Sequence, residues 1–275
     1  MTPKQAAAAD DAPAIAVERL TRAFGDHLAV RDASFAVRRG EIFGLIGPNG
    51  AGKSTLVKML ATLLPPTSGT ARVAGFDIGR QAREVRRHIG YVPQLLSADG
   101  ALTGYENLLL SARLYLIPRR ERKARIDAAF GEMGLEEAKD RLVQTYSGGM
   151  IRRLEIAQSM LHEPAVLFMD EPTVGLDPVA RHSVWGHVRA LRERLGATML
   201  LTTHLMDEAD ALCDRLGVLH AGVLEAIGAP AELKARVGPQ ATLDDVFAAI
   251  TGGEIASEGS YRDVRTDRRA ERVHG

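Results

Sequence analysis

A glycine-rich stretch with one lysine and a hydroxyl residue is the first sign of chemistry in this sequence. Residues 47–54 read GPNGAGKS, which fits the pattern G-x-x-x-x-G-K-[ST] between an apolar run and a helix-like run. Glycines let successive N–H groups turn toward phosphate oxygens, and the helix that follows adds its positive end. In this pattern Lys53 reaches the β- and γ-phosphates, and the Ser54 hydroxyl lies on Mg²⁺. The predicted nucleoside triphosphate site comprises Gly47, Pro48, Asn49, Gly50, Ala51, Gly52, Lys53, Ser54 and Thr55.

An acidic pair supplies a candidate for the metal and for the attacking water. Asp170 ends the apolar run AVLFMD, and Glu171 follows it. Ligands of parallel sheets gather at the carboxyl ends of strands, so Asp170 is expected to hold Mg²⁺ through water. Glu171 is expected to orient the attacking water or take its proton. An acidic pair that merely caps a turn before Pro172 is the simpler reading of these residues taken alone.

A second glycine turn raises a different question. Residues 146–150 read YSGGM, and the helix-like run IRRLEIAQSML follows. Ser147, Gly148 and Gly149 are therefore expected to form another anion site at a helix N-terminus. Such a site could fold onto the same nucleotide, or it could face outward and serve the nucleotide of a neighbour.

The elements that must position these groups belong to a mixed α/β chain. Short β-branched or aliphatic runs alternate with helical patterns, and the runs at 41–47, 165–170 and 197–202 are apolar enough for central strands. The first strands have no helices between them and predict an antiparallel edge. From about 96 to 161 the strand signal gives way to helical periodicity, which predicts a helical lobe.

These motifs together resemble the nucleotide-binding subunit of an ATP-binding cassette (ABC) transporter, from about Ile15 to Gly252. The resemblance implies a P-loop NTPase core, with a parallel sheet and an antiparallel β edge, at residues 14–252. It also implies an inserted helical signature subdomain at about 96–161. The form GGMIRRLEIA and the late LDDVFAAITG are similar to ABC-2 type exporters, especially the daunorubicin/doxorubicin-resistance group.

The resemblance assigns roles to further residues by position. Phe24 matches the aromatic that stacks on adenine, Gln94 the glutamine that senses Mg²⁺ and the attacking water, and His204 the histidine that contacts the γ-phosphate. The loop Gly175, Leu176, Asp177 matches the segment that crosses between subunits. Two positions depart from the commonest pattern: Tyr146 replaces leucine and Met150 replaces glutamine, while Ser147 and both glycines are intact.

The family closes two copies head to tail, so the resemblance implies a homodimer in which the second turn serves the partner's ATP. It further implies ATP and Mg²⁺ as cofactors and a separate ABC-2 type permease as partner. The expected location is cytoplasmic, peripheral on the inner face of the cell membrane, and drug or antibiotic efflux is the expected task. A soluble assembly or regulatory ATPase without a permease remains the alternative, which the exporter-like GGM turn and LDDVFAAITG ending disfavour.

Composition limits the other possibilities. The 275 residues carry 35 basic and 35 acidic side chains, so the net charge does not indicate binding to nucleic acid.

The stretches at 1–13 and 253–275 are expected to be a disordered leader and a disordered polar tail. No apolar run approaches the ~20 residues of a membrane span. The lone Cys213 is expected to pack as a small hydrophobe. The basic run at 118–125 is either a solvated helix face or a contact with anionic lipid headgroups.

Overall fold

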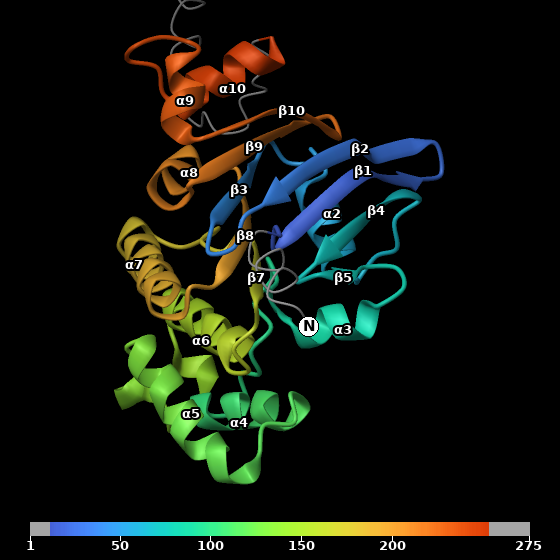
Figure 1. Ribbon diagram of the computed structural model, residues 1–275. Helices are drawn as coiled ribbons and strands as arrows, with labels where there is room; N and C mark the ends of the chain where they lie inside the picture. The colour runs from blue at the N-terminus through green and yellow to red at the C-terminus, as the bar shows by residue number, and fades with distance from the viewer. Residues whose placement is uncertain (1–11, 253–275) are drawn as a thin grey trace, which may run out of the picture.

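The computed structural model describes residues 12–252. The predicted tail at 253–275 and residues 1–11 of the predicted leader lie outside the described residues. Figure 1 shows a large central sheet, a second sheet beside it and a group of helices at the far end of the molecule. Within the described range, none of the helices combines the length and apolar character that crossing a bilayer requires.

The central sheet has six strands. In spatial order they are β10 (Val223–Gly228), β9 (Arg215–His220), β3 (Ile42–Ile46), β8 (Thr198–Thr203), β7 (Val166–Asp170) and β6 (Ile89–Val92). Neighbours from β9 to β6 pair in parallel, and β10 returns antiparallel along the edge. Every residue of β3, β7 and β8 is buried, which confirms that the continuous apolar runs form central strands.

The early strands form a separate antiparallel sheet. Its spatial order is β2 (His27–Val37), β1 (Ile15–Phe24), β4 (Ser68–Val73) and β5 (Phe76–Asp77). The predicted antiparallel strands are present, and they make a sheet of their own because β1 and β2 close a hairpin before the first strand of the central sheet begins. Helix α2 (Lys53–Leu60) packs between the two sheets.

Two cores cover the two faces of the central sheet. On β3, Phe43 and Leu45 enter the core that α2 and the antiparallel sheet share, whereas Ile42 and Ile46 enter the other core. This alternation is the period-two pattern of a strand. Both faces of the central sheet are therefore covered by apolar side chains, and only the ends of its strands remain accessible to a ligand.

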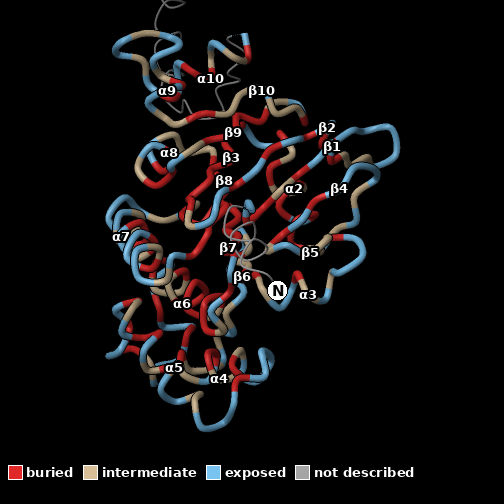
Figure 2. Tube along the Cα trace, in the orientation of Figure 1, coloured by how far each residue is buried: buried red, intermediate tan, exposed pale blue. Residues whose placement is uncertain are grey.

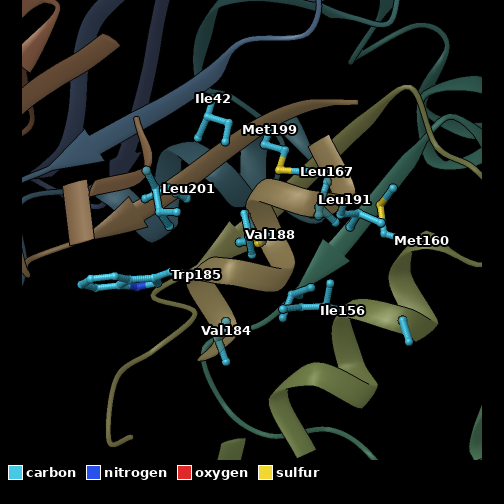
Figure 3. Close-up of a cluster of buried hydrophobic side chains, with 14 of the residues drawn as sticks. Ile42, Ile156, Met160, Leu167, Val184, Trp185, Val188, Leu191, Met199 and Leu201 are labelled. Atoms are coloured by element: carbon cyan, nitrogen blue, oxygen red, sulfur yellow. The ribbon is translucent and has the colours of Figure 1, made fainter. Parts of the chain in front are cut away.

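The second core is built mainly by helices. It contains side chains of α6 (Gly148–Met160) and α7 (Pro178–Leu195), with smaller contributions from α8 (Met206–Leu212) and α10 (Leu243–Thr251). Figure 3 shows Val184, Val188 and Leu191 of α7 in one buried cluster with Leu167, Met199 and Leu201 of the sheet, and Trp185 lies at one edge of it. Trp185 is thus a packing residue, as its helical spacing predicts, and the lone Cys213 is buried as well.

The chain from 104 to 160 is helical, in agreement with the pattern seen in the sequence. It contains α4 (Gly104–Leu114), α5 (Arg119–Glu132) and α6, with two short 3₁₀ turns at 136–138 and 143–145. The Thr103 side chain and Glu106 form a capping box that starts α4. Figure 2 shows buried segments both in this lobe and in the central sheet, and buried side chains of the two belong to one hydrophobic cluster. Outside the lobe, α3 (Ala82–Arg87) and α9 (Pro230–Ala235) are short surface helices.

Candidate active site

The phosphate loop connects the end of β3 to the start of α2, and its glycines are required by geometry. Gly52 has a φ of +101°, and a Cβ there would collide with the carbonyl oxygen of Ala29. Gly50 has a φ of +80°, a conformation that side chains disfavour. The loop therefore closes tightly over the N-terminus of α2, whose first N–H groups face the cleft.

Lys53 is buried and held by the loop itself. Its Nζ donates to the carbonyl oxygens of Gly47 (2.8 Å) and Pro48 (3.1 Å), and it lies 3.3 Å from Glu171 Oε1. Burial lowers the pKa of the Lys53 ammonium, and the Glu171 carboxylate opposes that effect. The Lys53 ammonium is thus a desolvated charge that Glu171 partly compensates, and it lies beside a turn that can bind phosphate.

Three predicted site residues converge on the Glu171 carboxylate. Besides Lys53, Gln94 Nε2 donates to Glu171 Oε2 (3.1 Å), and His204 Nδ1 lies 3.3 Å from Glu171 Oε1. The Glu171 side chain is only 5% exposed, whereas that of His204 is 35% exposed. Glu171 also has a φ of +48°, an uncommon backbone conformation for a residue with a side chain. The Glu171 N–H donates to the hydroxyl (3.0 Å) and carbonyl (3.1 Å) oxygens of Thr202, which hold that conformation.

Asp170 and Ser54 form the predicted metal position. Ser54 Oγ donates to Asp170 Oδ1 (2.9 Å), and the Thr202 hydroxyl donates to the same oxygen (2.6 Å). A carboxylate and a hydroxyl are hard oxygen ligands, which suit Mg²⁺. In the described part of the chain, no three His, Cys, Asp or Glu side chains are close enough to cage a metal. The donor set fits an ion that is completed by phosphate oxygens and water rather than one enclosed by protein.

Most of these groups line one cleft of about 460 Å³, and Asp170 and His204 contact lining residues from behind or beside it. Its lining includes Phe24, His27, Ala29, Gln94, Glu171 and the loop residues from Asn49 to Thr55. The Phe24 ring is 46% exposed at the rim, with the Arg22 guanidinium carbon 4.6 Å from its centre. A larger hollow of about 630 Å³ lies beside β4 and β5, and none of the predicted site residues line it.

The structure places the second glycine turn elsewhere. Ser147 caps α6 by accepting from the Met150 N–H (3.3 Å), and neither Ser147 nor the two glycines line the cleft. A Cβ on Gly148 would lie 3.2 Å from Leu176, so this turn, the signature turn (147–149), lies against the loop Gly175–Asp177. Asp177 in turn caps α7 through the N–H groups of residues 179 and 180, both at 3.0 Å. The two predicted intersubunit segments are thus neighbours on one surface.

The unusual first residue of the turn is structural. The Tyr146 ring is buried, and its hydroxyl donates to the carbonyl oxygen of Ala138 (2.6 Å). Burial raises the pKa of the Tyr146 phenol. Tyrosine at this position therefore anchors the start of α6 to the helical lobe without entering the anion turn.

Sequence reasoning missed two sets of contacts around the cleft. Thr202, on the strand beside Asp170 and Glu171, holds both of them, and only the order of strands in the sheet could have revealed it. Arg152 and Glu155 on α6 bind the segment that carries Gln94. In the sequence, Arg152 and Glu155 are three residues apart and so share one face of the helix. The adjacent Arg153 makes the stretch look like an ordinary basic surface.

Comparison with known proteins agrees with the geometry. Residues 30–174 match the profile of the family described as ABC transporter. The chain is 48% identical over 228 residues to the daunorubicin/doxorubicin resistance ATP-binding protein DrrA of Streptomyces peucetius, covering 82% of this chain and 68% of that protein. It is 42% identical over 240 residues to the probable multidrug ABC transporter ATP-binding protein YbhF of Escherichia coli (strain K12), covering 86% of this chain and 41% of YbhF. The chain thus spans less than half of YbhF.

A solved structure gives the same result for the fold. It is described as the ATP-binding subunit of an ABC transporter, and it superposes with a TM-score of 0.76 at 31% identity. The superposition covers 86% of this chain and 99% of that one. The α/β architecture predicted from the sequence is therefore confirmed.

Proposed function

This chain belongs to the ABC transporter family, and from that premise we propose that it is an ATP-hydrolysing subunit that drives export through a separate membrane permease. The observation that carries the proposal is the convergence of Lys53, Gln94 and His204 on the Glu171 carboxylate at the edge of a glycine-lined cleft. The proposed ligand is ATP, because the cleft joins an anion turn to an exposed aromatic ring that can stack on a base.

Hydrolysis follows from a change of partners inside the cleft. A γ-phosphate offers Lys53 stronger acceptors than the loop carbonyls, since ammonium–phosphate bonds are charge-assisted. Glu171 Oε1 then becomes available to a water molecule, while Gln94 keeps the other carboxylate oxygen oriented. The water oxygen bonds to the γ-phosphorus, its proton passes to Glu171, and the bond to the bridging oxygen breaks. The products are ADP and phosphate.

Ser54 and Asp170 are the residues that would hold Mg²⁺, with Gln94 near enough to the cleft to sense it. The ion would neutralise charge on the β- and γ-phosphate oxygens. His204 lies beside Glu171 and is partly exposed, so it could contact the γ-phosphate and help to shield it from bulk water.

We propose that the signature turn serves a second copy of this chain. Ser147 and Gly148 are exposed, and the turn lies outside the cleft of its own chain. Its N–H groups and hydroxyl suit a phosphate at a helix N-terminus. Two chains arranged head to tail would each complete the other's site, with Gly175–Asp177 at the same interface.

The proposed permease contact is a hollow of about 310 Å³ beside Gln94. Tyr91, Pro93 and Leu114 contribute to its lining, and Leu95 next to it is 81% exposed. An apolar segment of a permease would cover these side chains and bring the chain to the inner face of the membrane. DrrA and YbhF are named for drug resistance and multidrug transport, which supports a drug or antibiotic as cargo.

A mixing experiment tests the shared site. Lys53→Ala removes the ammonium from the cleft, and Ser147→Asp places a charge where the partner's phosphate would bind while it keeps a good N-cap. Each variant alone is expected to lose ATP turnover. An equal mixture is expected to recover turnover to at most about a quarter of the wild-type rate, because half of the pairs contain one intact site of two.

The control is a mixture of Lys53→Ala with Glu171→Gln, both of which damage the cleft itself. No pair in that mixture contains an intact site, so its turnover is expected to stay at the level of the separate variants. Equal recovery in both mixtures, or none in either, would contradict the head-to-tail arrangement.

A further inference from the structure

Helix α6 connects the signature turn to the segment that carries Gln94. It begins at the turn, and Arg152 lies five residues after Ser147, roughly 7–8 Å along the axis. Arg152, Glu155 and Ser159 occupy one face of the helix, as i, i+3 and i+7 spacing requires. Ser159 Oγ donates to the carbonyl oxygen of Tyr91 (3.0 Å), so this face follows β6 toward Gln94.

The Arg152 guanidinium holds the backbone at Gln94. It donates to the carbonyl oxygens of Pro93 (2.6 Å) and Gln94 (2.8 Å). The side chain of Gln94 in turn donates to Glu171 in the cleft (3.1 Å). An uninterrupted series of contacts therefore joins the signature helix to the carboxylate that takes the proton.

Glu155 holds the other end of the same segment. It accepts from the N–H and hydroxyl (3.1 Å) of Ser97 and from the Ala98 N–H (3.3 Å), and it pairs with Arg152 at 3.1 Å. Both side chains are only 2% exposed. The segment 93–98, here called the Gln94 loop, is clamped to α6 at both ends.

Stability alone is a weak reason for this pair. Burying two charges costs free energy that apolar side chains of similar size would not cost. Within residues 12–252, Arg152 Nε has no hydrogen-bond partner, so the guanidinium is not fully compensated. The contacts that the pair does make go to the backbone of one loop, which is the loop that presents Gln94.

We propose that Arg152 and Glu155 are positioning residues that couple the two nucleotide sites of the dimer. The start of α6 contacts the nucleotide of the partner, and the clamp on the same helix sets Gln94 at the nucleotide of its own chain. Filling one site therefore orders the Gln94 loop that serves the other site. This inference rests on the proposed ATPase dimer, and it predicts cooperative ATP turnover that depends on the clamp.

The test replaces the forked guanidinium by a single ammonium. Arg152→Lys keeps the charge, but one ammonium does not reproduce the two planar bonds to adjacent carbonyls. We expect kcat to fall about tenfold, the loss of roughly one charge-assisted hydrogen bond, and the Hill coefficient for ATP to fall toward 1. The Kd of a fluorescent ATP analogue for the cleft of the monomer should change by less than about twofold, since the clamp does not touch the phosphate loop.

Arg153→Lys is the matched control. Arg153 is the next residue of α6, and its guanidinium donates to the carbonyl oxygens of Met133 (2.7 Å) and Gly134 (3.4 Å) in the helical lobe. A variant there also weakens carbonyl contacts of α6, but not those to the Gln94 loop. We expect its kcat and Hill coefficient to stay within about twofold of the wild type.

Glu155→Gln is the second test. It decides the proposal if Arg152→Lys lowers the melting temperature so far that its kinetics cannot be compared with the wild type. It is expected to lower kcat and the Hill coefficient in the same direction. Equal effects at Arg152 and Arg153, or unchanged cooperativity in both clamp variants, would overturn the inference. Failure of the wild type to hydrolyse ATP or to dimerise with it would instead overturn the proposed function, so the two failures are distinguishable.

Discussion

The cleft and the signature turn both offer N–H groups at a helix N-terminus, yet they differ in every other respect. The cleft adds buried charges on Lys53, Asp170 and Glu171, and each of these is held by protein groups. The signature turn adds only the Ser147 hydroxyl and two glycines, of which Gly148 is exposed like Ser147 and Gly149 is buried. The cleft therefore has the groups expected of a reacting site, and the signature turn has those expected of a phosphate-binding surface.

In the dimer that we propose, this difference would assign different roles to the two regions. Buried charges must be positioned within a fraction of an ångström, so they lie on the ends of central strands that two cores immobilise. A turn that binds the nucleotide of a partner must approach and leave it, and Ser147 and Gly148 are exposed at the N-terminus of α6 without a charged side chain. Damage to the cleft should therefore affect chemistry or binding within one chain, while damage to the turn should appear only in the pair.

Glu171→Gln should give the largest effect, because it removes the carboxylate that we propose as the proton acceptor and keeps its shape. We expect kcat to fall by about 10²–10⁴-fold, the usual contribution of a general base. ATP binding should persist, and the pair should accumulate in its closed form. Turnover of [γ-³²P]ATP and size-exclusion chromatography with ATP measure both effects. The matched control is Glu163→Gln, because Glu163 is an exposed carboxylate paired with Arg125 and its loss should leave turnover unchanged. A wild-type rate in Glu171→Gln would show that Glu171 has no catalytic role.

Ser147→Asp should separate the two regions most sharply. Asp is as good an N-cap as Ser and a negative charge suits a helix N-terminus, so the variant should melt at or slightly above the wild-type temperature. Its own cleft should bind ATP normally. We expect ATP-dependent dimerisation to disappear and turnover to fall about 100-fold, because the new carboxylate faces the partner's phosphate. Ser147→Thr keeps a hydroxyl cap and should behave like the wild type, and turnover surviving in Ser147→Asp would mean that the turn does not meet a phosphate.

Phe24→Ala should have a smaller effect that is confined to the cleft. Base–aromatic stacking contributes about 1–3 kcal/mol, so loss of the ring should raise the Kd for ATP by roughly 5–100-fold with little change in kcat. The Kd for GTP should rise by a similar factor, since every base has a face to stack. Equilibrium binding of the two nucleotides measures this, with Phe24→Tyr as the control that keeps the ring. A change in ATP affinity without one in GTP affinity would indicate base-edge contacts instead of stacking.

Sequence reasoning reached the cleft and its strands because local patterns encode them. The glycine spacing at 47–52 and the apolar run ending at Asp170 each indicate the end of a strand. Parallel strands bring their carboxyl ends to the same edge of a sheet, so the two sets of residues are expected to lie close together. It did not reach Thr202 or Arg152, because their partners are distant in sequence and neither residue type implies such a role. The antiparallel pairing of the first strands was predicted and is confirmed, but their separation into a sheet of their own was not, since hairpin signals specify pairing between neighbours and not which sheet they join.

His162 should give the smallest effect, at the joint between the helical lobe and the central sheet. Its ring stacks on Tyr115 at 3.6 Å, and Nε2 lies 3.0 Å from the carbonyl oxygen of Ile89 in β6. Burial lowers the pKa of His162 to about 4, so the folded state keeps the ring neutral. The unfolded chain binds a proton near pH 6.5, so stability is intact above that pH and falls as the pH drops toward 4.

Because the ring is only partly buried, we expect a loss of about 1–2 kcal/mol in the free energy of unfolding between pH 7 and pH 4.5. Urea unfolding at several pH values measures it, and His162→Gln, which can still donate to the Ile89 carbonyl without titrating, should flatten that part of the profile. An identical pH profile in the variant would assign the loss to other groups. A flattened profile would assign this loss of stability to the contacts of His162 at the joint between the helical lobe and β6.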